Sequence, residues 1–352
     1  MPKHITWLVN DITLVGGIER VVCNLSNFFS QNDCIVKIAS LNTASGKPYF
    51  ELSNQVKIEH LGYPAQQILD RKKLKTAIKS FLETEDSDIL ITCHPWIAVP
   101  VLQNKKSYRG KIICTEHATW ESHSKARRVM NVLYYRHSDR LVLLTEHAKA
   151  IYKKFGVKNT TVIPNVIPSF PAQTAKLQSH ELIAAGRLIE IKGFDRLIEA
   201  INLIKDQFAS WHLTIYGDGD DKAKLLQLIN EHQLQDLITI ADFTDKLQAK
   251  LQACSGFVVS SHSEAFPMVV LEALSNGVPV ISFDIPSLRE IDQSRANIIF
   301  AEQDNVADLA VKISNYIQST DRKERGAKAR EIAESYSANK IIPLWIKLFD
   351  SL

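Results

Sequence analysis

The chain alternates short apolar runs with longer amphipathic runs, and this alternation constrains the fold more than any other feature. In the first half, strands are expected over residues 5–9, 35–40, 56–61, 89–92, 111–114 and 141–144. Helices are expected between them, over residues 18–29, 66–82, 97–103, 126–135 and 146–155. Repeated strand–helix units build parallel sheets covered by helices, so this half predicts a doubly wound α/β domain.

The same pattern restarts in the second half. Strands are expected over residues 182–185, 212–216, 238–240, 257–259 and 278–282. Helices are expected over residues 194–204, 223–232, 246–253, 267–274 and 306–317. The segment 163–179 is rich in proline and shows little periodicity, which favours a linker. We therefore predict an α/β chain of two Rossmann-like domains, over 1–165 and 180–338, joined by a linker at 166–179. The carboxyl ends of both sheets would face a ligand crevice.

Composition limits the class of protein. The chain has 352 residues, 45% of them hydrophobic, which suffices for two cores. Its five cysteines form no Cys-x-x-Cys pair or metal-ligand spacing, and the apolar stretch near the N-terminus is short for a signal peptide. We therefore expect a cytoplasmic protein. Residues 1–170 hold 23 Lys and Arg against 14 Asp and Glu, a net charge of +9 that favours an anionic partner.

One segment carries most of the functional signal. Residues 256–259 predict a buried strand and residues 267–274 a helix, with Pro267 suited to the first helical position. The free N–H groups at a helix start attract phosphate. Glu264 and Glu272 place two carboxylates nearby, so a ligand with a phosphate and a diol, such as a sugar nucleotide, would fit. A capping loop with a solvated glutamate fits this segment alone equally well.

The sequence Ser-x-x-Glu-Ala-Phe-Pro, followed by Leu-Glu-Ala-Leu with seven residues between the two glutamates, resembles the signature of retaining glycosyltransferases of family 4. That family has the GT-B fold. The resemblance implies that Glu264 approaches the donor sugar and Glu272 holds the ribose hydroxyls. It also implies donor-binding backbone at Ala265, Phe266, Pro267 and Met268. Many members have glycine where this chain has Ala265, and alanine is tolerated there unless a positive φ is needed.

A second motif, Gly186-Arg187-Leu188 followed by Lys192-Gly193-Phe194, places two cations in one loop after a strand. Two fixed cations can neutralise a departing diphosphate, although such a loop can also be merely solvated. The resemblance implies that Arg187 and Lys192 grip the donor diphosphate. With these cations no divalent metal is required, so we expect no metal and no cofactor. Gly217 resembles the family's turn beneath the nucleotide, and a tight turn alone explains it equally well.

The first half matches the family more loosely. Gly16-Gly17-Ile18-Glu19-Arg20 resembles the family's loop beside the acceptor pocket and donor phosphates, which implies donor contacts from Gly16 and Gly17. It lacks the spaced glycines of a dinucleotide fingerprint, so no nicotinamide cofactor is expected. His117 ends the sequence Cys-Thr-Glu-His, where a lone histidine is more often structural. The resemblance implies instead that it lies near the reacting sugar and hydrogen-bonds the donor sugar or orients the acceptor, without acting as an essential base. The last helix, at about 339–352, is expected to return to the first domain.

The implied reaction moves a sugar, a hexose or N-acetylhexosamine, from a nucleoside diphosphate sugar, most simply a UDP-sugar, to a hydroxyl with retention. Basic helices at 66–82 and 126–135 favour contact with an anionic membrane, although their apolar sides could equally pack on their own sheet. A lipid-linked saccharide acceptor at the inner face of the membrane, as in capsule or lipopolysaccharide assembly, would fit; free glucan and protein acceptors stay open.

Two other functions remain open on the sequence. A sugar-nucleotide 2-epimerase of the same fold would release nucleotide without an acceptor. A non-catalytic module for nucleotide or nucleic acid would use the basic half. Nucleic-acid binders interleave aromatic residues with their basic clusters, and these clusters show no such pattern, so we expect no nucleic-acid partner.

Overall fold

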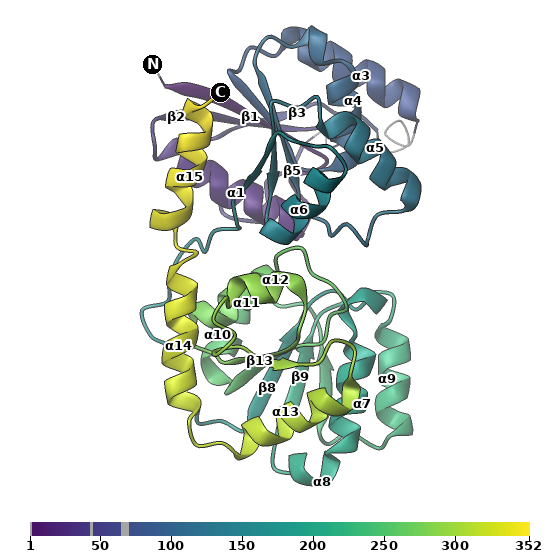
Figure 1. The fold of residues 1–352 in the computed structure, drawn as a ribbon, viewed down its shortest axis with the longest axis vertical. Helices are drawn as coiled ribbons and strands as arrows, with labels where there is room; N and C mark the ends of the chain where they lie inside the picture. Colours follow the sequence, from purple (N-terminus) through teal and green to yellow (C-terminus); the bar gives the residue numbers. More distant parts are fainter. Residues whose placement is uncertain (1, 43–44, 65–69) are drawn as a thin grey trace. The chain divides into compact units, whose positions relative to one another are not determined.

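The computed structural model describes residues 2–42, 45–64 and 70–352 of the chain. It separates into two compact units, Met1–Pro168 together with Ala338–Leu352, and Ser169–Ser337. Each unit is a parallel sheet covered by helices (Figure 1), so the expected α/β class with two Rossmann-like sheets is confirmed.

The sheet of the first unit follows the order β3-β2-β1-β4-β5-β6-β7, with every neighbouring pair parallel. Its strands are β1 (Lys3–Val9), β2 (Cys34–Ser40), β3 (Lys57–His60), β4 (Ile89–Thr92), β5 (Lys111–Glu116), β6 (Arg140–Leu143) and β7 (Thr160–Val162). The strand order reverses between β1 and β4. Ligands bind beyond the carboxyl ends of the strands at such a reversal in open α/β sheets. The short strand β7 was not among the expected strands, because three residues carry too little periodicity.

Helices cover both faces of this sheet because successive strand residues point to opposite sides. They are α1 (Gly17–Ser30), α3 (Arg71–Thr84), α4 (Pro95–Gln103), the 3₁₀ turn η1 (Lys105–Ser107), α5 (Lys125–Tyr135), α6 (Glu146–Lys154) and α15 (Ala338–Asp350). The expected start of the helix at 66–82 lies outside the described residues. Leu8 belongs to a core cluster with side chains of α3, α4 and α5. On the other face, Trp7 stacks on Phe29 of α1 and meets Trp345 of α15 edge-on. The last helix is therefore part of the first unit's core.

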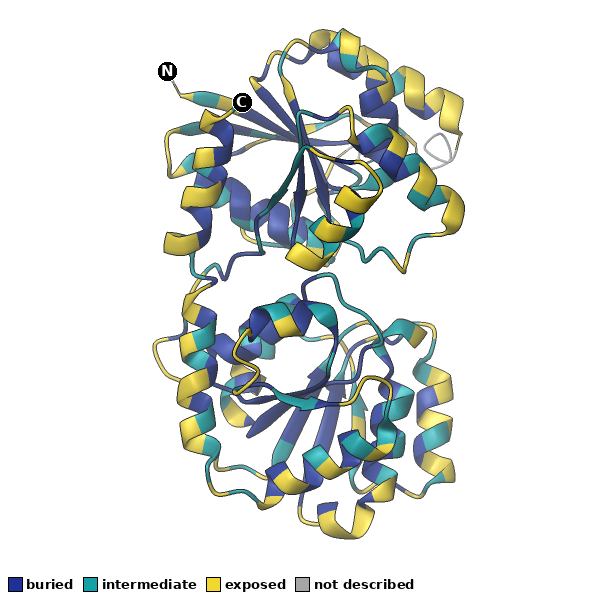
Figure 2. Cartoon of the chain, viewed as in Figure 1, coloured by how far each residue is buried: buried dark blue, intermediate teal, exposed yellow. Residues whose placement is uncertain are grey.

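The second unit has the sheet order β10-β9-β8-β11-β12-β13, again all parallel, and the order reverses between β8 and β11. Its strands are β8 (Glu181–Ala185), β9 (His212–Tyr216), β10 (Ile238–Ala241), β11 (Gly256–Val259), β12 (Val280–Phe283) and β13 (Ile299–Ala301). Figure 2 shows most of the strand residues of both units as buried, with exposed positions on the outer faces of the helices.

Two groups of helices flank this second sheet. In the first group, α7 (Phe194–Leu203) contacts α9 and α13; in the second, α11 (Met268–Ser275) contacts α10 and α14. The remaining elements are η2 (Glu190–Lys192), α8 (Lys205–Phe208), α9 (Lys222–Glu231), α10 (Leu247–Ala253), α12 (Pro286–Ile291), α13 (Val306–Gln318) and α14 (Arg322–Glu334). The sequence did not predict β13, α8, α12 or α14. The first three are short, and α14 is mostly polar, so apolar periodicity could not identify it.

The structure corrects one local prediction and refines another. Pro267 is the N-cap of α11 and not its first helical residue, because its φ of −75° and ψ of 111° are extended. Part of the expected linker packs within the second unit: the Ala175 N–H donates to the Asn276 carbonyl at 2.8 Å, and both Ala175 and Leu177 are buried.

Four of the five cysteines, at positions 23, 93, 114 and 254, are buried as free thiols. Burial raises the pKa of each of these thiols to about 12. Such thiols stay protonated and behave as small core residues. In the part of the chain that the structure describes, no helix is both long enough and apolar enough to cross a bilayer.

Candidate active site

The strongest candidate site lies at the strand-order reversal of the second unit. The loop after β8 carries Arg187 and Lys192, and the loop after β11 carries Glu264. Because β8 and β11 are neighbours, these two loops emerge side by side from the carboxyl edge of the sheet. Two of the predicted site residues, far apart in sequence, are thereby in direct contact.

Lys192 and Glu264 form an ion pair at this point. The Lys192 Nζ lies 2.6 Å from Glu264 Oε1, with the two side chains 20% and 12% exposed. Ser261 Oγ donates to the same carboxylate oxygen at 2.7 Å. The pair is partly shielded from water, so the attraction between its two charges is stronger than in a fully exposed pair.

Backbone contacts hold the two loops together. The His262 N–H donates to the Ile191 carbonyl at 2.9 Å, and Ser260 Oγ donates to the Lys192 carbonyl at 3.0 Å. Gly193 has a φ of +61°, and a Cβ there would lie 2.3 Å from the Ser260 carbonyl oxygen. The loops therefore meet so closely that only glycine fits at position 193, which fixes Lys192 relative to Glu264.

Arg187 lies in the same loop and is exposed. Its guanidinium group has no hydrogen-bond or ion-pair partner among the residues that the structure describes. A solvent-facing guanidinium beside a paired lysine gives this edge of the sheet two cations, one fixed and one available to a ligand.

The start of α11 adds backbone donors. The N–H groups of Met268 and Val269 have no acceptor within the described parts of the chain, whereas those of Val270 and Leu271 donate to the Pro267 carbonyl. Unpaired N–H groups at a helix start attract anions. Ala265 is not among the residues with positive φ, so alanine is accommodated where many family members have glycine.

The remaining predicted donor residues in this unit have structural contacts. The Phe266 ring is buried and meets Tyr336 edge-on at 5.4 Å, so only its backbone could face a ligand. Glu272 is half-buried, one turn into α11. Gly217 donates to the Ala241 carbonyl at 3.0 Å, and a Cβ on it would lie 1.9 Å from the Gly186 carbonyl oxygen. Close approach of the two turns explains the glycine at 217, and its contact with a donor stays a prediction.

In the first unit, Gly16 is the N-cap of α1 and Gly17 the first helical residue. A Cβ on Gly16 would lie 2.1 Å from a carboxylate oxygen of Glu19, which is buried beneath it. A Cβ on Gly17 would meet nothing within 4 Å. The Glu19 carboxylate therefore packs against the backbone at Gly16, whereas the space beside Gly17 is open to a ligand.

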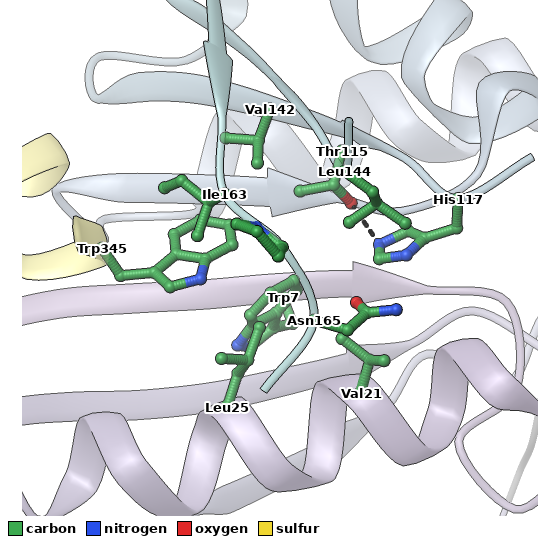
Figure 3. A pocket seen from close by; sticks show the side chains of 11 residues that line it. Trp7, Val21, Leu25, Thr115, His117, Val142, Leu144, Ile163, Asn165 and Trp345 are labelled. Atoms are coloured by element: carbon green, nitrogen blue, oxygen red, sulfur yellow. Dashed lines mark hydrogen bonds between the residues drawn. The ribbon is translucent and has the colours of Figure 1, made fainter. Parts of the chain in front are cut away.

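His117 follows β5 and lines a small, mainly apolar pocket of the first unit (Figure 3). Its Nε2 lies 2.9 Å from Thr115 Oγ1, and Thr115 donates its only hydroxyl hydrogen to the Thr92 carbonyl at 3.2 Å. The imidazole must then donate from Nε2, which assigns the Nε2–H tautomer and leaves Nδ1 as a hydrogen-bond acceptor.

The neutral form of His117 is strongly favoured. Burial lowers its pKa to about 4, with the nearby Glu116 opposing and His94 adding to this shift. A neutral imidazole at pH 7 can accept a hydrogen bond from a hydroxyl at Nδ1, in keeping with an orienting role for His117.

His94 lies near His117, and no sequence motif indicated it. It is the N-cap of α4, two residues after the end of β4, and its Nε2 is buried without a hydrogen-bond partner among the described residues. Burial also lowers its pKa. The sequence feature that could have indicated His94 is its position two residues after a predicted strand. Its nearness to His117, however, depends on β4 and β5 being neighbours in the sheet.

Glu116 supports the loop that carries His117. The carboxylate is 4% exposed and accepts hydrogen bonds from the Ala118 N–H, Tyr135 Oη and Tyr152 Oη at 3.0, 3.1 and 3.2 Å. His123 Nε2 lies 3.2 Å from it as well. A buried carboxylate with this many partners orients its surroundings.

The two basic helices of the first unit differ in how they use their apolar sides. In α3, Leu74, Ile78 and Phe81 are buried in the core, so that side packs on its own sheet. In α5, Val129 and Leu133 are 58% and 45% exposed, one helical turn apart. The apolar side of α3 is thus unavailable to a membrane, whereas α5 presents an apolar strip to solvent.

The second sheet presents two cations, a carboxylate and a helix start at its reversal point, which suits a phosphorylated ligand. Two parallel Rossmann-like sheets in one chain define the GT-B class. The chain belongs to the glycosyltransferases of this class: the model "Glycosyltransferase Family 4" matches residues 15–169 and "Glycosyl transferases group 1" matches residues 167–333. The amylovoran biosynthesis glycosyltransferase AmsD of Erwinia amylovora is 30% identical over 288 residues, 79% of this chain and 80% of that protein.

Solved structures share the fold. A Staphylococcus aureus TarM mutant in complex with fondaparinux, alpha-GlcNAc-glycerol and UDP has a TM-score of 0.84 at 17% identity, covering 99% of both chains. Sucrose-phosphate synthase from Thermosynechococcus elongatus has a TM-score of 0.85 at 17% identity, covering 99% of this chain and 100% of that one. These likenesses extend over both units and bear out the GT-B fold.

Proposed function

We propose that this chain transfers a hexose or N-acetylhexosamine from a UDP-sugar to a hydroxyl of a saccharide acceptor, with retention at the anomeric carbon. The observation that carries the proposal is the contact between Lys192 and Glu264 beside the start of α11. It supplies a cation, backbone donors and a carboxylate at one edge, which are the groups that a diphosphate and an attached sugar require.

In the proposed reaction, the bond between the anomeric carbon and the donor phosphate oxygen breaks, and its electron pair leaves with the UDP. The acceptor oxygen forms the new bond on the same face of the sugar, and its proton passes to the departing phosphate. Lys192, Arg187 and the N–H groups of Met268 and Val269 stabilise the charge that builds on the diphosphate. Glu264 orients the sugar and Glu272 the ribose.

We also propose that the reaction needs no metal and no cofactor, because Arg187 and Lys192 supply two positive charges to the diphosphate. Turnover with a UDP-sugar should then survive an excess of EDTA. A loss of turnover that added Mg²⁺ or Mn²⁺ restores would refute this part of the proposal.

The acceptor is proposed to be an oligosaccharide or lipid-linked saccharide of a surface polysaccharide, used at the cytoplasmic face of the membrane. AmsD acts, by its name, in the biosynthesis of the polysaccharide amylovoran, and the TarM complex contains a glycerol-linked α-GlcNAc, which supports this acceptor class. The exposed Val129 and Leu133 of α5 and the exposed lysines of α3 would contact anionic lipid. Flotation with phosphatidylglycerol vesicles, compared with phosphatidylcholine vesicles, tests the membrane contact.

A panel of sugar nucleotides, scored by thermal shift and by nucleotide release with and without acceptor, tests the function. The proposal expects a shift with one class of UDP-sugar and release that accelerates with a saccharide acceptor. Fast release without any acceptor, with a changed sugar in the product, would identify a 2-epimerase instead. Tight filter binding of single-stranded nucleic acid at moderate salt would identify a nucleic-acid-binding module.

A further inference from the structure

A stacked pair of aromatic rings lies at the surface of the first unit, in the loop that follows His117 and at the end of α6. The rings of Trp120 and Phe155 are nearly parallel, with an interplanar angle of 13° and centroids 4.9 Å apart. Phe155 is nevertheless 47% exposed. A single exposed apolar residue is ordinary in a soluble protein. A ring that is backed by a second ring and still open to solvent presents a flat surface of defined orientation.

The helix end fixes the position of Phe155. Gly156, with a φ of +86°, follows the last helical turn, and its N–H donates to the Lys153 carbonyl at 2.9 Å. The Val157 N–H then reaches back to the Tyr152 carbonyl at 3.0 Å. These two bonds close the end of α6 in the manner of a glycine C-cap, so Phe155 is held by backbone geometry.

Two residues besides Phe155 hold Trp120 in place. Its ring meets Tyr152 edge-on at 5.3 Å, and Tyr152 is itself bonded to the buried Glu116. The Arg128 guanidinium lies over the Trp120 ring at 5.5 Å, and its Nε donates to the Trp120 carbonyl at 2.9 Å. A ring fixed in this way loses little entropy when a ligand stacks on the pair.

Three lysines lie within three positions of Phe155 in the sequence. Lys153, Lys154 and Lys158 are all exposed, and none has an acidic partner in the part of the chain that the structure describes. The chain thus places an aromatic surface near several unpaired cations. The loop between β5 and α5 carries both His117 and Trp120, three positions apart.

We propose that the exposed ring of Phe155, backed by Trp120, forms a stacking subsite for a sugar ring of an anionic saccharide acceptor, whose phosphate or carboxylate groups meet Lys153, Lys154 and Lys158. The electron-rich face of an aromatic ring attracts the C–H face of a pyranose, and burying both faces removes apolar surface from water. The lysines favour an acidic saccharide over a neutral one. This inference rests on the proposed transferase function and specifies the chemistry of its acceptor.

Calorimetric titration of the full chain with two probes tests the subsite: a sulfated heparin-type pentasaccharide, and maltopentaose as an uncharged saccharide of the same length. The wild type should bind the sulfated probe more tightly. Phe155→Ala should weaken that binding about three- to tenfold, the range that one aromatic contact supports. Phe155→Leu, which keeps apolar bulk without a flat face, should weaken it to a similar degree, and Phe155→Tyr should bind as the wild type does.

Several results would overturn the subsite. One is a Phe155→Ala variant that binds the sulfated probe as tightly as the wild type does, and another is a wild type that binds neither probe. A Phe155→Leu variant with wild-type affinity would also overturn it, because that result would indicate a nonspecific apolar contact such as a membrane. Leu203→Ala, which removes an exposed apolar side chain of α7 in the other unit, should change nothing. The UDP-sugar thermal shift should be equal in the wild type and Phe155→Ala; if the wild type shows no shift with any sugar nucleotide, the proposed function fails independently of the subsite.

Discussion

Lys192 Nζ and Glu264 Oε1 lie 2.6 Å apart, although 72 positions of sequence separate the two residues. The contact joins a cation proposed to hold the donor diphosphate to a carboxylate proposed to orient the donor sugar. A bound diphosphate would compete with Glu264 for the lysine. Binding of the donor diphosphate to Lys192 is thereby linked to the position of Glu264, which is proposed to orient the donor sugar.

Replacing Lys192 with alanine should mainly lower turnover. The lysine charge stabilises the leaving diphosphate most strongly in the transition state, so kcat for sugar transfer should fall about 10²- to 10³-fold. Steady-state kinetics with saturating UDP-sugar measures the effect. Lys328→Ala, which breaks an exposed ion pair of α14 with Glu324, is the matched control and should keep wild-type kcat. Unchanged kcat in Lys192→Ala would remove this residue from the site.

Glu272→Ala should weaken donor binding. A carboxylate on the ribose hydroxyls contributes about 1.5–3 kcal/mol, so Kd should rise roughly ten- to a hundredfold. Because the ribose is common to both ligands, calorimetry should show the same loss for UDP and for UDP-sugar. Glu264→Ala should instead weaken the binding of UDP-sugar relative to that of UDP, because it removes the sugar contact and leaves Lys192 free for the diphosphate of both ligands. Equal Kd values in Glu272→Ala and in the exposed-site control Glu331→Ala would contradict the ribose assignment.

Gly193→Ala should destabilise the second unit. The residue has a φ of +61°, and the new Cβ would lie 2.3 Å from the Ser260 carbonyl oxygen. The left-handed conformation alone costs a non-glycine residue about 1–2 kcal/mol, and the backbone clash adds to that. Gly156→Ala is a suitable comparison, since its φ is +86° and nothing lies within 4 Å of the added Cβ. Urea unfolding should show a larger loss of unfolding free energy for Gly193→Ala, and equal losses would argue against the close contact of the two loops.

The neutral, half-buried His117 should make the protein less stable in mild acid. Its pKa is about 4 in the folded chain and 6.5 in the unfolded chain, so the unfolded chain binds more protons between these values. Stability should therefore fall as the pH drops below 6.5, by about 2 kcal/mol between pH 7 and pH 5 from this group.

The measurement compares urea unfolding at pH 7 and pH 5 in the wild type and in His117→Gln. The variant should lose less stability on acidification, whereas the exposed-site variant His137→Gln should follow the wild type. An identical pH dependence in wild type and His117→Gln would show that His117 is already protonated in the folded chain at pH 5.

The local elements could be read from the sequence because strand and helix periodicity is a property of consecutive residues. The run at 257–259 and the amphipathic stretch at 194–204 became β11 and α7 within a residue of the expected bounds. The polar helix α14 was not predicted, because it lacks the apolar periodicity on which helix prediction depends.

The candidate site was predictable only in part. Motif resemblance indicated Glu264, Lys192 and Arg187 one by one. It did not show that Lys192 and Glu264 touch, or that His94 lies near enough to influence the pKa of His117, because neither relationship can be deduced from neighbouring positions in the chain. Phe155, which ends an unremarkable basic helix, gave no sequence signal at all.

What the sequence by itself determined is the class of the fold and the chemical types of residue that end its strands. Local periodicity determines the class of the fold, and short motifs identify the residue types at the strand ends. The tertiary structure alone decided which strands are neighbours, and therefore which loops meet at the reversal points β1–β4 and β8–β11. The physical reason is that strand order follows from burying both faces of each sheet through right-handed crossovers, which is a condition on the whole unit and not on any one segment.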